Sequence, residues 1–341
     1  MGNCMESQVN KLMATGNLER EELKELLKFR NPETTEYLYE MACLVRNKTQ
    51  ENTAAVWGRI PISSYCKYDC KMCGLRRENQ FAKRYRMDLS QILQYCHAFA
   101  ENGVHHFLLE SGDDVYFSEN RVAEILLAIK KYHPDAVIVL SMGEKTKSAY
   151  RHWNHVGADS YLLRFGTADE INFKRLYPAN MSLLLRKQSL WELKQEGYHT
   201  GTGFLVGLPY QTIDSVTEDI LFMKSFGADS IYMGTFIPAL RTPFERERCG
   251  NGDMALYIMA ILRLMLPAAD VIAEPSLDCV LKEGRMKAFD AGANVMIADI
   301  DDMEILRQYK VYERKNGRFS LPADVVPEIV ERLRGKGMAV E

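Results

Sequence analysis

Short apolar segments and longer amphipathic segments alternate along most of the chain, beginning near Ala54. The short segments have the length of buried strands, and the longer ones place their apolar residues at helical spacing. Strands joined by helices form parallel sheets with right-handed crossovers, and eight such units can close into a barrel. We therefore expect an α/β fold, a (β/α)8 barrel of the TIM type. The predicted strands are Ala54–Ile60, His106–Glu110, Ala136–Ser141, Ser160–Arg164, Thr200–Val206, Ser230–Phe236, Val271–Glu274 and Asn294–Ala298, and helices are predicted at Leu89–Asn102, Arg121–Tyr132, Leu183–Glu196 and Ser215–Phe226.

The segments on either side of this repeat lack its pattern. Residues 1–50 indicate helices only, notably Arg20–Phe29 with its leucines on one face and Thr34–Arg46. We expect three regions: an N-terminal helical cap (1–50), one catalytic domain formed by the barrel (51–300), and a C-terminal extension packed on the barrel (301–341). The extension has strand-like and helical patterns around Lys310–Arg318 and Val325–Arg334. A glycine follows several predicted helices, where a left-handed residue ends a helix: Gly103, Gly157, Gly197, Gly227 and Gly292.

The composition mainly argues against binding to nucleic acid or membranes. The 341 residues are 47% hydrophobic and carry a formal net charge of −3, which gives no general attraction to nucleic acid or to an anionic membrane. No apolar run reaches the roughly 18 residues that a membrane-spanning helix needs, and the first residues lack the order of a signal peptide. We expect a cytoplasmic protein that binds neither nucleic acid nor membrane.

Three of the eight cysteines are clustered: Cys66, Cys70 and Cys73 have the spacing C-x3-C-x2-C. Thiolates are soft ligands that select iron–sulfur clusters or zinc, and structural zinc sites usually take four ligands in paired C-x2-C form. A cubane cluster held by three thiolates keeps one iron open for another ligand. The spacing therefore favours an iron–sulfur cluster over zinc. The remaining cysteines are isolated in the sequence and are expected to be small buried apolar residues.

The barrel fold places chemistry in the loops that follow the strands. Polar or glycine-rich segments occur at those positions after six of the predicted strands. They are Cys66–Cys73, Glu110–Asp114, Ser141–Glu144, Arg164, Gly207–Gln211 and Pro275–Asp278.

The cysteine triplet resembles the signature of the radical S-adenosylmethionine (SAM) superfamily. That resemblance implies a [4Fe-4S] cluster on Cys66, Cys70 and Cys73 whose open iron binds SAM, and reductive cleavage of SAM to a 5′-deoxyadenosyl radical. Met72 matches the position that faces the adenine, and Gly112-Asp113 matches the turn that offers carbonyl groups to the SAM amino group.

Further segments are similar to the group that contains biotin synthase, the [FeFe]-hydrogenase maturase HydE and methylornithine synthase, and most similar to HydE. They include Cys73–Asn79, Lys83–Met87, Tyr161–Arg164 and Val206–Thr212. Within this resemblance Arg186 matches an arginine that pairs with the SAM carboxylate, the alternative being a solvent-facing helix arginine. Arg164 should point into the barrel mouth, where a SAM or substrate contact is favoured over a structural ion pair. The expected cofactor-binding residues are Met72, Gly112, Asp113, Ser141, Glu144, Arg164, Arg186 and Gly207.

The chain also departs from these relatives. Gly166 stands where they have a glutamate that helps to hold the SAM amino group, so that contact is either lost or supplied by another residue such as Asp113 or Glu144. Ser276 and Asp278 resemble methylornithine synthase, where both bind an amino-acid substrate. Glu274 and Asp278 make the pocket acidic, which favours an ammonium-bearing substrate unless Arg241, Lys282 or Arg285 neutralises them. The expected substrate-binding residues are Tyr232, Glu274, Ser276 and Asp278.

The leading hypothesis is a HydE-like enzyme whose radical acts on a small, possibly amino-acid-like, molecule inside the barrel. An amino-acid carbon-skeleton mutase similar to methylornithine synthase is the alternative, and a non-catalytic cluster-binding protein is a third, supported by Gly166 alone. A reducing partner such as ferredoxin or flavodoxin is implied by the same resemblance. No auxiliary cluster is expected, because no cysteine follows Cys279.

Overall fold

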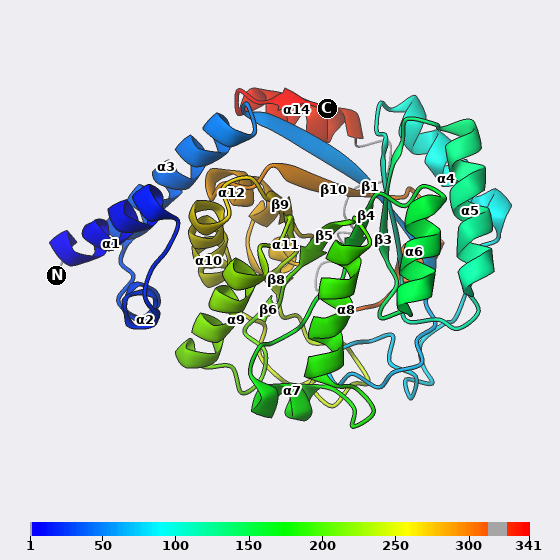
Figure 1. Ribbon diagram of the computed structural model, residues 1–341, viewed down its shortest axis with the longest axis horizontal. Coiled ribbons are helices and arrows are strands. Elements are labelled where there is room, and N and C mark those ends of the chain that lie inside the picture. Colours follow the sequence, from blue (N-terminus) through cyan, green and yellow to red (C-terminus); the bar gives the residue numbers. More distant parts are fainter. Residues whose placement is uncertain (1, 313–325) are drawn as a thin grey trace.

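The computed structural model describes residues 2–312 and 326–341. Within these residues eight parallel strands close into a barrel, because β1 pairs with β2 on one side and with β10 on the other (Figure 1). The expected barrel is confirmed. Its strands are β1 (Thr53–Ser63), β2 (His106–Ser111), β3 (Val137–Ser141), β4 (Ser160–Leu162), β5 (His199–Thr202), β7 (Ser230–Ile231), β9 (Asp270–Ala273) and β10 (Val295–Asp299).

Side chains alternate between the two faces of each strand, so every second residue points into the barrel. One buried apolar cluster fills this interior and takes residues from most of the strands. Its members are Trp57, Leu108, Val139, Leu162, Tyr232, Ile272, Val295 and Ile297. A larger apolar core separates the strands from the surrounding helices. The next inward positions, two residues further along the same strands, lie nearer the mouth of the barrel and are the ones that build the site.

Two of the predicted strands are interrupted. The segment predicted as one strand over Thr200–Val206 forms β5 and then β6 (Leu205–Val206), and Ser230–Phe236 forms β7 and then β8 (Gly234–Thr235). The separated ends β6 and β8 pair with each other. At the break, a Cβ on Gly203 would lie 2.2 Å from the carbonyl oxygen of Tyr232, so only glycine permits this close backbone approach.

Helices cover the outside of the barrel, and their starts follow from capping residues. Asp88 and Thr212, for example, each form a capping box, which satisfies backbone N–H groups at a helix start. All five glycines predicted to end helices have positive φ angles. The surrounding helices are α4 (Leu89–Glu101), α5 (Glu119–Tyr132), α6 (Lys147–His155), α7 (Glu170–Leu176), α8 (Leu183–Gln195), α9 (Ile213–Phe226), α10 (Gly252–Met265), α11 (Leu277–Val280) and α12 (Gly284–Asp290).

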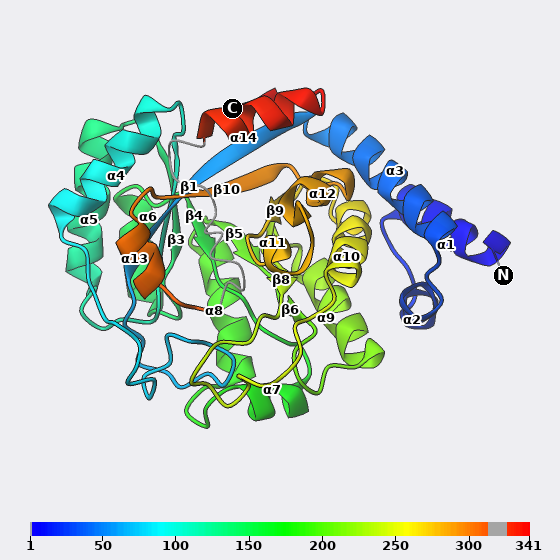
Figure 2. The same ribbon diagram turned by 180° about the vertical axis from the view of Figure 1, so that it is seen from behind.

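The two ends of the chain lie on the outside of the barrel (Figure 2). The N-terminal helices α1 (Gly2–Thr15), α2 (Arg20–Lys28) and α3 (Pro32–Thr49) pack mainly against α9 and α10. After β10 come α13 (Met303–Gln308), α14 (Val326–Gly335) and β11 (Ala339–Val340), and β11 pairs with the start of β1. Most of the pattern predicted at Lys310–Arg318 lies outside the described residues, and the division into three regions stays a prediction. No helix in the described part of the chain is long and apolar enough to cross a membrane.

Candidate active site

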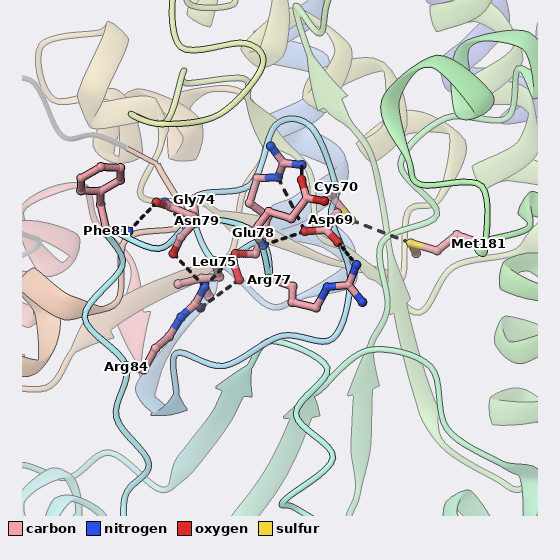
Figure 3. Close-up of polar contacts among 11 residues, drawn as sticks. Asp69, Cys70, Gly74, Leu75, Arg77, Glu78, Asn79, Phe81, Arg84 and Met181 are labelled. Atoms are coloured by element: carbon pink, nitrogen blue, oxygen red, sulfur yellow. Dashed lines mark hydrogen bonds and ion pairs between the residues drawn. The ribbon is translucent and has the colours of Figure 1, made fainter.

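The cysteines lie in a long loop that leaves the end of β1 and returns to it. The backbone N–H groups of Ser64 and Met87 donate to Tyr85 and Ile62, so the two ends of the loop pair beside the strand. Inside the loop the Arg84 guanidinium donates to the carbonyl oxygens of Leu75 and Arg76, at 3.0 and 2.7 Å. Figure 3 shows Arg84 reaching back into this turn. The loop is therefore a folded unit held by its own polar contacts.

A second set of contacts shapes the turn nearest the cysteines. Asp69 accepts the backbone N–H of Glu78 at 2.8 Å and pairs with Arg77 at 2.7 Å (Figure 3). Asn79 donates to the carbonyl oxygen of Gly74 at 2.8 Å. These contacts close the stretch that carries Cys70 and Cys73 into one compact turn.

The three clustered thiols are free and half-buried. Burial raises the pKa of Cys70 most, Cys73 and Cys66 raise it further, and Arg186 acts in the opposite direction. Burial likewise raises the pKa of Cys73, to about 12, and Cys66 adds to this effect. Each thiol therefore lies within the electrostatic reach of the others, and thiolates form there only when positive charge compensates them.

The chemistry of this donor set fits an iron–sulfur cluster. The donors are three cysteine thiols, which are soft and half-buried. Cys70 also packs against an apolar group around Met72, Leu208 and Phe236, which would exclude water from a bound cluster. Soft, desolvated donors of this kind fit a [4Fe-4S] cluster.

The turn after β2 lies directly against the cysteine loop. A Cβ on Gly112 would lie 2.3 Å from the carbonyl oxygen of Tyr65, so a side chain there would push the loops apart. The carbonyl oxygen of Asp113 accepts the N–H of Lys67 at 2.9 Å. The Asp113 carboxylate pairs with Lys67 at 3.1 Å and with Lys145 at 2.6 Å. This carboxylate, expected to hold the SAM amino group, already has two cationic partners.

Glu144 is also engaged. It forms an ion pair with Arg186, whose Nη1 donates to the carbonyl oxygen of Arg164 at 2.7 Å. Arg186 lies in the first turn of α8 and is 8% exposed, so the alternative of a solvent-facing arginine is wrong. Its guanidinium instead lies within the electrostatic reach of Cys70. Ser141 ends β3 beside Glu110 in the sheet register, and Gly207 lies against Gly250 with φ +87.

Arg164 points into the barrel mouth as expected, but its partner belongs to the protein. Its Nη2 lies 2.9 Å from Oε1 of Glu274, and its guanidinium stacks over the Tyr232 ring at 3.9 Å. Arg164 therefore forms a structural ion pair, although a contact with SAM or substrate was favoured from the sequence. Burial raises the pKa of Glu274, but Arg164 and Ser276 outweigh burial and hold the pKa below its usual value. Glu274 is accordingly an ionised carboxylate in the barrel.

The expected substrate residues divide between two sides of α11. The Ser276 N–H donates to Glu274 at 2.8 Å and its hydroxyl accepts the N–H of Thr235 at 3.0 Å, which keeps Ser276 at the barrel mouth. Asp278 is exposed and bonds Nε of Arg285 at 2.5 Å. Residues two apart on a helix are rotated by about 200°, so Ser276 and Asp278 face different sides. The predicted alternative, neutralisation by a cation at the rim, is confirmed for Asp278, which pairs with Arg285. Glu274 instead pairs with Arg164.

Three charged residues in the barrel had received no role from the sequence. Arg59 bonds Oδ1 of Asp299 at 2.6 Å and lies 3.6 Å from Oε2 of Glu110. The Tyr232 hydroxyl donates to Glu110 at 3.1 Å. Arg59, Glu110 and Asp299 each follow an inward apolar residue by two positions, which is a signal visible in the sequence. Together with Arg164 and Glu274 they form a charged layer above the apolar interior.

Comparisons with known proteins agree with this geometry. The family model described as "Radical SAM superfamily" matches residues 60–223. The [FeFe] hydrogenase maturase subunit HydE of Thermotoga maritima is 32% identical over 92% of this chain and 89% of its own length. The 3-methylornithine synthase of Methanosarcina acetivorans is 28% identical over 96% and 92% of the two chains. A crystal structure of methylornithine synthase (PylB) superposes with a TM-score of 0.85 at 25% identity, covering 98% of this chain and 97% of that one.

These similarities extend over almost the whole chain, not only over the cysteine loop. They confirm the resemblance that was inferred from the motifs, and with it the barrel fold and the grouping with HydE and methylornithine synthase. The chain therefore belongs to the radical SAM superfamily and is a radical SAM enzyme.

Proposed function

We propose that the enzyme reductively cleaves SAM at a [4Fe-4S] cluster held by Cys66, Cys70 and Cys73, and acts on a small substrate inside the barrel in the manner of a HydE-like maturase. The supporting observation is that Cys70 packs against an apolar group and lies within the electrostatic reach of Cys66, Cys73 and the buried Arg186 guanidinium. When bound, the cluster supplies the electron that splits SAM into methionine and a 5′-deoxyadenosyl radical.

The protein's own residues would bind and orient SAM around this site. Arg186 offers a planar cation to the SAM carboxylate and would exchange Glu144 for it. Gly112 lets the turn after β2 approach the cysteine loop, and Met72 offers an apolar surface. The residues proposed to contact SAM are Met72, Gly112, Asp113, Ser141, Glu144, Arg164, Arg186 and Gly207.

The substrate would lie on the charged layer of the barrel. Tyr232, Glu274 and Ser276 are buried there. Arg164 contacts Tyr232 and Glu274, and Ser276 donates its N–H to Glu274. Asp278 lies on the other side of α11, so a direct substrate contact would require it to leave Arg285. The proposed substrate residues are therefore Tyr232, Glu274 and Ser276, together with Asp278 once it has left Arg285.

The first test is SAM cleavage. Protein reconstituted with iron and sulfide without oxygen, then reduced with dithionite, should convert SAM to 5′-deoxyadenosine, measured by liquid chromatography. Cys70→Ala should abolish this product because the cluster loses one ligand. Cys43→Ala is the matched control, since that thiol lies on α3 and donates to the carbonyl oxygens of Phe289 and Asp290. An intact cluster by electron paramagnetic resonance (EPR) with no 5′-deoxyadenosine would refute the proposed function.

A second candidate function is an amino-acid mutase. It is favoured by the superposition with methylornithine synthase over nearly the whole chain, and by the ionised Glu274 at the barrel mouth. The discriminating experiment supplies deuterated free amino acids and measures deuterium in 5′-deoxyadenosine by mass spectrometry. Transfer from one amino acid supports the mutase, and no transfer from any of them supports the HydE-like function.

The reaction also needs a source of electrons and a reducing compartment. We propose a low-potential partner such as ferredoxin or flavodoxin, and a cytoplasmic location in which the thiols stay reduced.

A further inference from the structure

Gly166 follows β4, and the phenol of Tyr177 fills the space where its side chain would be. A Cβ built on Gly166 would lie 2.0 Å from the phenol oxygen and 2.7 Å from Cζ. Gly166 is buried and has a φ angle of +87, a conformation that side-chain-bearing residues rarely adopt. The space beside Gly166 is therefore occupied by Tyr177, and a larger residue at position 166 would clash with the phenol.

Tyr177 is held beside the cysteine loop by contacts on several sides. It ends α7, and its ring stacks on Phe173 with centroids 4.3 Å apart. The preceding carbonyl oxygen, that of Leu176, accepts the N–H of Lys71 at 2.9 Å. A little further along, Met181 Sδ lies 3.8 Å from Cys70 Sγ, as Figure 3 shows. Tyr177 also packs against the apolar group that contains Met72.

The phenol has charged neighbours but no hydrogen bond. The Arg186 guanidinium carbon lies 5.9 Å from its ring centroid. Burial raises the pKa of Tyr177, more than Arg186 and Arg164 lower it, so the hydroxyl stays protonated. Among the described residues, none forms a hydrogen bond with this hydroxyl. Tyr177 is half-buried, and its neutral phenol can both donate and accept a hydrogen bond.

Resting on the function proposed above, we propose that Tyr177 is a SAM-binding residue whose hydroxyl hydrogen-bonds the methionine end of SAM, and that Gly166 is small in order to admit it. The methionine end carries an ammonium group and a carboxylate, and a phenol can serve either. The Tyr177 hydroxyl lies between the cysteine loop and Arg186. The methionine end of SAM would lie in the same place if Cys70 holds the cluster and Arg186 binds the SAM carboxylate.

The test compares SAM binding to wild type and Tyr177→Phe, which keeps the ring and removes the hydroxyl. Both proteins are reconstituted without oxygen, and iron and sulfide are counted first. We expect equal cluster content, about 3- to 10-fold weaker SAM binding by calorimetry, and an altered change in the EPR spectrum when SAM is added to the reduced protein. Tyr198→Phe is the control, since its hydroxyl donates to the Tyr150 carbonyl at 2.7 Å, outside the site.

A second comparison tests the pairing of the two residues. Gly166→Ala should weaken SAM binding because the new Cβ displaces the phenol, but it should cost little affinity in a Tyr177→Ala background. Equal losses in both backgrounds would refute the pairing.

The outcomes separate this inference from the proposed function. A wild-type protein that assembles the cluster yet neither binds nor cleaves SAM refutes the function itself. If the wild type does both and Tyr177→Phe has the same SAM affinity and EPR response, only the role of Tyr177 is overturned.

Discussion

Arg59 and Asp299 form an ion pair inside the barrel, on neighbouring strands whose register places them side by side. Arg59 also lies near Glu110, and both pair members are buried. Charges in such a place are stable only together, because each has lost its hydration. At the residue scale, the charges above the apolar interior therefore stabilise one another. Tyr232 contacts this layer through Glu110, and Arg164 stacks over the Tyr232 ring.

Breaking this pair should be costly. Arg59→Met and Asp299→Asn should each lower the free energy of unfolding by about 3 kcal/mol, because each leaves a buried charge without its main partner. The double variant should lose less than the sum of the two. Urea unfolding without oxygen measures this. Arg151→Met is the control, since its pair with Glu196 is exposed and should change stability by less than about 1 kcal/mol. Additive losses in the double variant would show that the two charges act independently.

Some positions of single residues can be predicted from the sequence, whereas their ion-pair partners cannot. The inward positions of Arg59, Glu110 and Asp299 follow from strand alternation, so their grouping could have been predicted. The ion pair of Asp278 with Arg285 could not have been predicted, because it depends on the residue at which the short helix α11 begins. One residue of difference in that start would rotate Asp278 by about 100°.

At the scale of elements, a buried carboxyl joins α9 to the segment that follows β4. Asp219 accepts the hydroxyl of Thr167 at 3.1 Å and the N–H of Ala168 at 2.5 Å. Its other carboxyl oxygen has no hydrogen bond among the described residues. Burial raises the pKa of Asp219 to about 7, against the lowering effect of Ala168 and Thr167. This contact fixes the segment in which Gly166 receives the Tyr177 phenol.

The raised pKa predicts a pH dependence of stability. The folded state binds the Asp219 proton more tightly than the unfolded state, so this residue stabilises the fold at low pH. That contribution falls as the pH rises toward about 7, by at most about 1.4 kcal/mol per pH unit, and then levels off. Asp219→Asn should give a flatter profile from about pH 5 to about pH 8, measured by urea unfolding at each pH. A wild-type slope that persists in Asp219→Asn would assign it to other groups.

The order of elements was predictable, but their continuity was not. Period-two and helical patterns gave the eight strands and the helices between them, and glycine gave the helix ends. The breaks between β5 and β6 and between β7 and β8 were missed. At these breaks the backbone of Gly203 lies close to that of Tyr232, a contact between segments that are separated in the sequence.

At the scale of the whole molecule, the C-terminal elements extend the sheet beyond the closed barrel. β11 pairs with Thr53 and Ala54 at the start of β1, while α14 buries Ile329 and Leu333. Figure 1 shows α14 lying along the outside of the barrel near β1. The last residues of the chain thus support the strand that leads into the cysteine loop.

Leu333→Ala should therefore destabilise the protein by about 2–5 kcal/mol, because it removes a fully buried side chain and leaves a cavity. Thermal or urea unfolding measures the loss. Arg334→Ala, on the exposed face of the same helix, should change stability by less than about 0.5 kcal/mol. Equal stability of Leu333→Ala and wild type would mean that α14 does not contribute to the cooperative fold.

The sequence by itself determined the barrel, the cysteine loop and the family, because these depend on periodicity, spacing and local motifs that a linear pattern records. Only the tertiary structure decided which charges are partners: Glu274 with Arg164, Asp278 with Arg285, and Asp113 with two lysines. It also placed the Tyr177 phenol against Gly166, eleven positions earlier in the chain. Contacts of this kind depend on the relative placement of loops and helices, since several partners lie within reach of each charged or polar group.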